Sequence, residues 1–258
     1  MDNNGQQNFY SEPIDFEKPQ KPSLKALEDP LFLALCILTT ISSAISFDVF
    51  SILITIGMWM AYVNIQNAKS PLSGAKLVAG TLKALYIFNW VCVPIFFLIG
   101  AFCFIFSGVI GRSEGVMILF DKYVLAEINV TEYFLETGIL DSFEDISKLI
   151  TVASVVMGIA LMFAAIVLIL LNIFFFCKLY KFAASVRDSM TSEHDEILYA
   201  DTVKTWLLVL AILNGISLPS AILSFSDVLP IGITVAVYAV AYVWIKKHFS
   251  RPVINIQV

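Results

Sequence analysis

Residues 31–63 form an apolar block that contains a single charged residue, Asp48. One helix of that length would be about 50 Å long, whereas the hydrocarbon core of a bilayer is about 30 Å thick. The block therefore predicts a hairpin over residues 30–66 that turns at Asp48. Either both arms span the membrane and Asp48 lies at the far surface, or the hairpin is re-entrant and holds a functional carboxylate inside the bilayer.

Four further apolar blocks are each long enough to cross a membrane. The chain is 59% hydrophobic and 14% charged, whereas a soluble domain is about half apolar and a quarter charged. We therefore expect an all-α polytopic membrane protein with about six transmembrane helices, the last two forming a hairpin over 205–245 that turns near Asp227. The four blocks are residues 84–108, 149–177, 205–225 and 228–245.

The positive charges predict the orientation of the chain. Of the 16 Lys and Arg residues, 13 fall in four segments that alternate with the apolar blocks. Cytoplasmic loops carry such an excess, so both termini are predicted to be cytoplasmic. The first segment is polar and is expected to be a disordered tail, ending in Asp29 and Pro30 as N-cap and first helical residue. The four segments are 1–29, 67–83, 178–204 and 246–258.

Two connections mix apolar and charged residues. Residues 109–148 hold eight acids and three bases and predict an acidic, amphipathic extracytoplasmic region. Residues 178–204 predict a cytoplasmic helical hairpin, with Ser192 and Asp195 placed to cap its second helix. An apolar stripe on its first helix either docks on a partner protein or folds back on the chain itself. The candidate partner-binding residues of this stripe are Phe182, Val186 and Met190.

Three residues within the spans are candidates for ligand binding: Asn89, Asn214 and Pro219. Proline removes a backbone hydrogen bond, so the helix that contains Pro219 is expected to kink or break. A broken helix near the middle of the membrane can offer backbone groups to a ligand. The alternative is a bend whose free backbone groups are satisfied by neighbouring helices.

The two outer hairpins share a short pattern. The string DVFSILIT at 48–55 matches DVLPIGIT at 227–234 in five of eight positions. The match indicates either an internal repeat of the kind that some transporters have, or chance similarity between apolar strings.

Other classes of function are disfavoured. The four cysteines form no CxxC pair, the two histidines are far apart, and no catalytic fingerprint is present, so we expect no metal, no cofactor and no enzyme activity. A net charge of −5 argues against nucleic acid as a partner. The excess of lysine over arginine favours a bacterial plasma membrane as the location. The lipid bilayer is expected to be the main partner.

Two functions remain from different classes. The first is an interaction, accessory or scaffold subunit that binds a membrane-protein partner or forms a homo-oligomer, favoured by the apolar stripe and the acidic outer region. The alternative is a small carrier or channel for a neutral or lipid-like substrate, favoured by the repeat and by Pro219.

Overall fold

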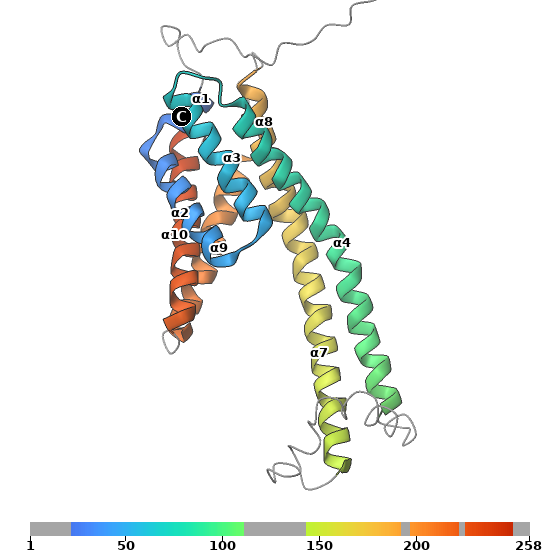
Figure 1. The fold of residues 1–258 in the computed structure, drawn as a ribbon. Helices are drawn as coiled ribbons and strands as arrows, with labels where there is room; N and C mark the ends of the chain where they lie inside the picture. The colour runs from blue at the N-terminus through green and yellow to red at the C-terminus, as the bar shows by residue number, and fades with distance from the viewer. Residues whose placement is uncertain (1–21, 111–142, 192–196, 222–224, 250–258) are drawn as a thin grey trace, which may run out of the picture. The chain divides into compact units, whose positions relative to one another are not determined.

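The computed structural model describes residues 22–110, 143–191, 197–221 and 225–249 (Figure 1). Within these ranges every element is a helix and no strand occurs. Helices satisfy all their backbone hydrogen bonds internally, which a bilayer requires. The expected all-helical membrane architecture is confirmed: five helical stretches are long and apolar enough to cross a membrane, and a shorter apolar helix precedes them. The five are Val49–Gln66, Leu72–Val109, Leu149–Ser189, Ala200–Pro219 and Val228–His248.

The described chain divides into two compact units, which are treated separately below. Unit 1 takes its residues from 1–87 and 173–258, and unit 2 from 88–172. The helix α4 contributes its first part to unit 1 and its second part to unit 2. The elements are α1 (Pro22–Glu28), α2 (Pro30–Ser46), α3 (Val49–Gln66), α4 (Leu72–Ile110), α7 (Phe143–Leu171), the π-helix η2 (Asn172–Phe176), α8 (Cys177–Ser189), α9 (Ala200–Ala221) and α10 (Phe225–His248).

Two aspartates define the ends of the first hairpin. Asp29 caps α2, with Pro30 at the first helical position, as the sequence predicts. Phe47 then adopts a left-handed conformation with φ of 49°, and Asp48 caps α3 by accepting a 2.8 Å hydrogen bond from the backbone N–H of Ser51. The arms contain 17 and 18 residues, or about 25 Å of helix each. The turn at Phe47 and Asp48 thus separates two arms of nearly equal length.

Hydroxyl groups join α2 to α3. The Thr55 hydroxyl donates to the carbonyl oxygen of Thr39 at 3.3 Å and lies 3.3 Å from the Ser43 hydroxyl. Closer to the other end of the hairpin, Trp59 Nε1 donates to Thr40 Oγ1 at 2.8 Å. Such bonds hold helices together in a bilayer, where apolar contact alone gives little preference for protein over lipid.

We expect Thr55→Val, which keeps the shape of the side chain, to lower the free energy of unfolding by about 0.6 kcal/mol, a typical value for an interhelical hydrogen bond in a membrane. Unfolding in mixed detergent and dodecyl sulfate micelles measures the change. Thr205→Val is the matched control, because the Thr205 hydroxyl bonds only within its own helix, to Asp201. An equal loss in both variants would contradict an interhelical role for Thr55.

The backbones of α3 and α4 cross closely at two glycines of unit 1. A Cβ atom built on Gly74 would overlap the carbonyl oxygen of Gly57 and the backbone nitrogen of Ala61, and would lie 2.9 Å from the Ala61 Cα. A Cβ atom on Gly57 would lie 3.0 Å from the Gly74 carbonyl oxygen. Glycine is therefore required at Gly74 by the neighbouring backbone.

In unit 2 the second part of α4 packs on α7 through another glycine pair. A Cβ atom on Gly100 would lie 3.2 Å from the carbonyl oxygen of Gly158, and one on Gly158 would lie 3.1 Å from that of Gly100. Small residues permit this approach, as in other membrane helix pairs. The contact is made within one chain.

The last hairpin differs from expectation in two places. The helix α9 begins at Ala200, later than a cap at Ser192 implies, because Tyr199 has φ of 64° and cannot continue a right-handed helix. The helix runs through Pro219 without a break. α10 begins at Phe225, so Asp227, near which the hairpin is predicted to turn, lies in its first turn. The capping pair itself, and most of the acidic region 109–148, lie outside the described residues.

Candidate functional site

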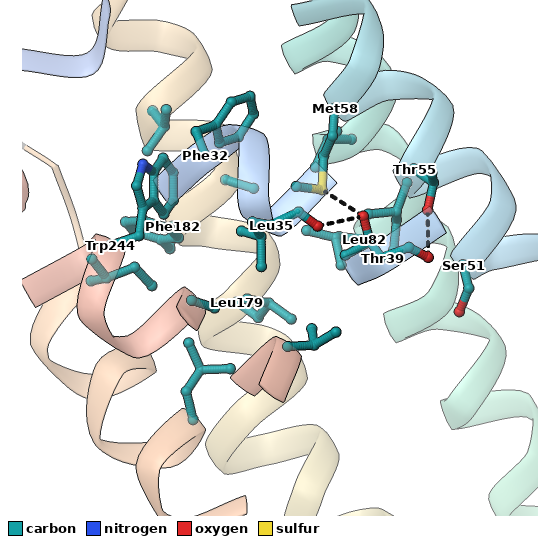
Figure 2. Close-up of a pocket in the computed structure, with 18 of the residues that line it drawn as sticks. Phe32, Leu35, Thr39, Ser51, Thr55, Met58, Leu82, Leu179, Phe182 and Trp244 are labelled. Carbon is teal, nitrogen blue, oxygen red and sulfur yellow. Dashed lines mark hydrogen bonds between the residues drawn. The ribbon is translucent and has the colours of Figure 1, made fainter. Parts of the chain in front are cut away.

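Unit 1 contains an apolar cavity of about 370 Å³ (Figure 2). It is lined by residues of α1, α2, α3, the first part of α4, η2, α8, α9 and α10. Along α2 the lining runs from Phe32 to Ser42, which is about 15 Å of helix. A cavity of that length suits an extended molecule better than a rounded one.

The walls of the cavity carry no charge among the described residues that form them. Aromatic side chains gather at the α1 end: the Phe32 and Trp244 ring centroids are 5.4 Å apart, and the rings of Trp244 and Phe182 both stack edge-on against Phe249. Towards the α2–α3 turn the lining contains the hydroxyl groups of Thr39, Ser51 and Thr55. The two ends of the cavity thus differ in polarity.

Most of the lining hydroxyls already donate their proton within the chain. Thr39 donates to the Leu35 carbonyl oxygen at 2.9 Å, Ser51 to Asp48 Oδ2 at 2.7 Å, and Thr234 to the Pro230 carbonyl oxygen at 2.9 Å. Each of these oxygens keeps a lone pair, so it can only accept a hydrogen bond from a ligand.

Two lining hydroxyls differ from the others. Ser42 on α2 and Tyr238 on α10 line the cavity, and neither forms a hydrogen bond with the residues that the structure describes. Neither hydroxyl oxygen is among the fully buried side-chain atoms that lack a hydrogen-bond partner. Both hydroxyls therefore retain a proton that a ligand could accept.

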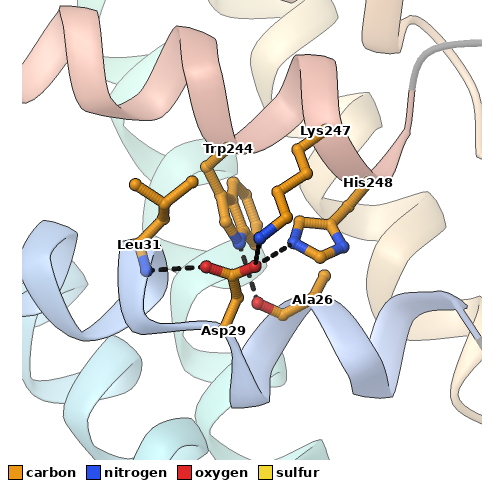
Figure 3. A network of polar contacts seen from close by, with 6 residues as sticks. All are labelled: Ala26, Asp29, Leu31, Trp244, Lys247 and His248. Carbon is orange, nitrogen blue, oxygen red and sulfur yellow. Dashed lines mark hydrogen bonds and ion pairs between the residues drawn. The ribbon is translucent and has the colours of Figure 1, made fainter.

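A polar cluster lies beside the aromatic end of the cavity, where Trp244 both lines the cavity and contacts α1 (Figure 3). Asp29 Oδ1 accepts from the backbone N–H of Leu31 at 2.8 Å. Its other oxygen, Oδ2, pairs with Lys247 and lies 2.8 Å from His248 Nε2. The indole N–H of Trp244 donates to the carbonyl oxygen of Ala26 in α1 at 2.8 Å. We call Asp29, Lys247 and His248 the latch, because they hold α1 and the start of α2 against the end of α10.

The latch keeps Asp29 ionised. Burial raises the pKa of this carboxyl group, since only 6% of its side chain is exposed, but hydrogen bonds from Lys247, Leu31 and His248 outweigh burial and lower the pKa from 3.8 to about 2. An ionised carboxylate only accepts hydrogen bonds, so Nε2 of His248 is the protonated ring nitrogen. Both oxygens of the Asp29 carboxylate therefore have partners within the chain.

The polar residues predicted to bind a ligand are not part of the cavity lining. The Asn214 side chain donates to the Leu210 carbonyl oxygen at 2.8 Å, one turn earlier in α9. Asn89 is buried in the unit 2 part of α4, and its amide nitrogen has no partner among the residues described. Because α9 is continuous through Pro219, no broken helix exposes backbone groups there.

The stripe predicted on α8 is used within the chain. Phe182, Val186 and Met190 all line the cavity, and the first two are buried in the core of unit 1. Of the two alternatives left open, partner docking and folding back, the structure therefore has the second. The physical reason is that α8 packs against α9 and that Phe182 contacts Phe249, just after α10, so the apolar face of α8 has an internal surface to cover.

Apart from Phe182, Val186 and Met190, the side chains that line the cavity were not singled out from the sequence. Tyr238 stands in an uninterrupted apolar block, where periodicity does not reveal which face is buried. The one available signal is the pattern of Thr234, Tyr238 and Ala241 at helical spacing on α10.

The chain matches no protein-family model, no curated protein and no solved structure.

Proposed function

We propose that this chain is a multi-pass membrane protein that binds, and carries within the membrane, a neutral lipid-like molecule in the cavity of unit 1. The observation that supports this proposal is an elongated cavity, among apolar helices, whose described lining has no charged side chain. A charged ligand would lose its hydration in such a site without gaining a counter-charge. A neutral lipid has no such cost.

The dimensions and chemistry of the cavity agree with this proposal. Ligand sites are commonly cavities of about 300–1,000 Å³, mostly apolar, with a few polar groups that fix orientation. Here the polar groups are hydroxyls, and the side chain that lies at mid-length is Tyr238. The excess of lysine suggests that the membrane is a bacterial plasma membrane.

An alanine pair on α10 tests the proposal. Ala241 lines the cavity, whereas Ala239 is exposed on another face of the same helix. We expect the wild type and Ala239→Trp to retain one lipid when released from mild detergent for native mass spectrometry, and Ala241→Trp to lose at least about nine-tenths of it by filling the cavity. The indole occupies existing space, so Ala241→Trp should still unfold cooperatively.

Two outcomes would contradict the proposal. One is a wild-type protein that never carries a lipid above the level of non-specific adducts. The other is equal retention by the Ala241→Trp and Ala239→Trp variants. The expectation of an accessory or scaffold subunit stays a prediction, which a stoichiometric protein partner in the same spectra would support.

A further inference from the structure

Two residues of the cavity lining, Ser42 and Tyr238, carry hydroxyl groups that form no hydrogen bond with the described residues, and they stand at a depth where an ordinary bilayer lipid has only hydrocarbon. We propose that these two groups recognise a hydrogen-bond acceptor on the bound lipid, so that the ligand is an uncharged long-chain molecule bearing a carbonyl oxygen. This inference rests on the proposed function and specifies the class of ligand.

The position of Tyr238 on α10 supports this assignment. The cavity-lining residues of this helix recur at helical spacing, and Tyr238 is near the middle of their stripe. A tyrosine hydroxyl in an apolar environment normally finds a partner, because an unpaired polar group is costly there. The stripe consists of Thr234, Val237, Tyr238, Ala241, Trp244 and Ile245.

The depth of the two donors follows from helix geometry. Tyr238 precedes Lys247 by nine residues, which is about 14 Å along α10 and close to half of a hydrocarbon core of about 30 Å. Contact between Phe32 and Trp244 fixes the antiparallel register of α2 and α10. In that register Ser42 lies within about 6 Å of the level of Tyr238.

The remaining lining hydroxyls have no proton left to offer a ligand. Thr39, Ser51 and Thr234 give their protons to the chain itself. The indole N–H of Trp244 is also engaged, by Ala26. Ser42 and Tyr238 thus supply the free protons, and a carbonyl oxygen is an acceptor that either of them can bind.

This arrangement favours a different position for the polar group of a bound lipid than for that of a lipid in the surrounding bilayer. A bilayer lipid keeps its polar end at the interface, since a carbonyl group in hydrocarbon lacks a donor. The cavity provides donors at mid-depth, so a carbonyl-bearing chain can lie there with its polar group satisfied. Both acyl esters and quinone-like molecules have this chemistry, and probes of each kind separate the two sources.

The test compares photoactivatable probes of equal chain length in nanodiscs. Each has a diazirine on an 18-carbon chain, and they are a methyl ketone, a methyl ester, an alkyl benzoquinone and the plain alkane. Saturable labelling is read by intact mass spectrometry, and the labelled peptide is located. We expect at least one carbonyl probe to bind about 2- to 12-fold more tightly than the alkane, the range for one net hydrogen bond.

Matched variants identify the donor. Tyr238→Phe should abolish the carbonyl preference while leaving alkane labelling unchanged, and Ser42→Ala should reduce it. Tyr242→Phe is the control, because Tyr242 is one turn away on α10, outside the lining, with Lys246 5.9 Å from its ring centroid. Cooperative unfolding of each variant confirms that it is folded. If Tyr238→Phe does not fold, Ser42→Ala provides the second measurement.

The outcomes distinguish this inference from the proposed function. Equal labelling by carbonyl and alkane probes, with cavity peptides modified, would overturn carbonyl recognition and leave lipid binding intact. A preference that persists in both Tyr238→Phe and Ser42→Ala would do the same. If none of the probes labels the cavity saturably, lipid binding itself is wrong.

Discussion

Gly74→Ala is expected to lower the free energy of unfolding by about 3 kcal/mol, at the upper end of the usual range for overpacking. The added methyl group would overlap the backbone of α3 at Gly57 and Ala61. A backbone neighbour cannot rotate away as a side chain can, so α3 and α4 must move apart. Unfolding in mixed micelles with dodecyl sulfate, followed by circular dichroism, measures the loss.

Gly80→Ala is the matched control for this prediction. It lies on the same helix, and no heavy atom lies within 4 Å of a Cβ built there. Alanine is favoured over glycine in a helix by about 1 kcal/mol, so this variant should be as stable as the wild type or slightly more stable. If the two variants unfold at the same fraction of dodecyl sulfate, α3 and α4 do not cross as described.

The second large effect is expected at the latch, where Asp29→Ala should lower the free energy of unfolding by about 2 kcal/mol. About 1 kcal/mol comes from the lost N-cap of α2 and the rest from the hydrogen bonds to Lys247 and His248. The second part is modest because 56% of the Lys247 side chain is exposed, and water screens the pair. Asp29→Asn keeps a good N-cap and should lose only that second part.

Acid should remove the same contribution in the wild-type protein. The folded pKa of Asp29, about 2, is below its ordinary value of 3.8, so the unfolded chain binds the proton more readily. The stabilisation is complete above about pH 4 and is lost as the pH falls through 2. The difference in stability between the wild type and Asp29→Asn should therefore shrink between pH 4 and pH 2.

Asp201→Ala provides the control for the latch experiments. Asp201 forms an ion pair with Lys204, but 62% of its side chain is exposed, and exposed pairs contribute little. Its replacement should change stability by less than about 0.5 kcal/mol at any pH. An Asp29→Ala variant no less stable than Asp201→Ala, or a gap that widens in acid, would contradict the latch.

Local signals in the sequence predicted the local structure well. The Asp29–Pro30 pair marks the start of α2 because a carboxylate caps the first turn and proline fits its first position. Asp48 divides a block too long for one membrane crossing, and it caps α3 in the structure. Each of these features is decided within a few residues, which is the range over which sequence patterns act.

Long-range packing set the features that were not predicted. The partner of Asp29 is 218 positions away, and nothing near Lys247 indicates it. Asn214 and Pro219 drew attention because they are polar or helix-breaking, but Asn214 bonds within α9 and the helix continues past Pro219 to Ala221. The place of Tyr238 in an apolar string does not show that it lines a cavity. That role depends on the residues of other helices around it, and it is visible only in the folded unit 1.

The latch also has a consequence for synthesis. Lys247 and His248 leave the ribosome 218 and 219 residues after Asp29. At about 5–20 residues per second, Asp29 waits roughly 10–45 s for its partners. Through that interval α1 has no α10 to contact, and the cavity lacks the wall that α10 provides. Unit 1 is therefore completed only when the end of α10 has been made, and a chain stalled before Trp244 would leave Asp29 without Lys247 and His248.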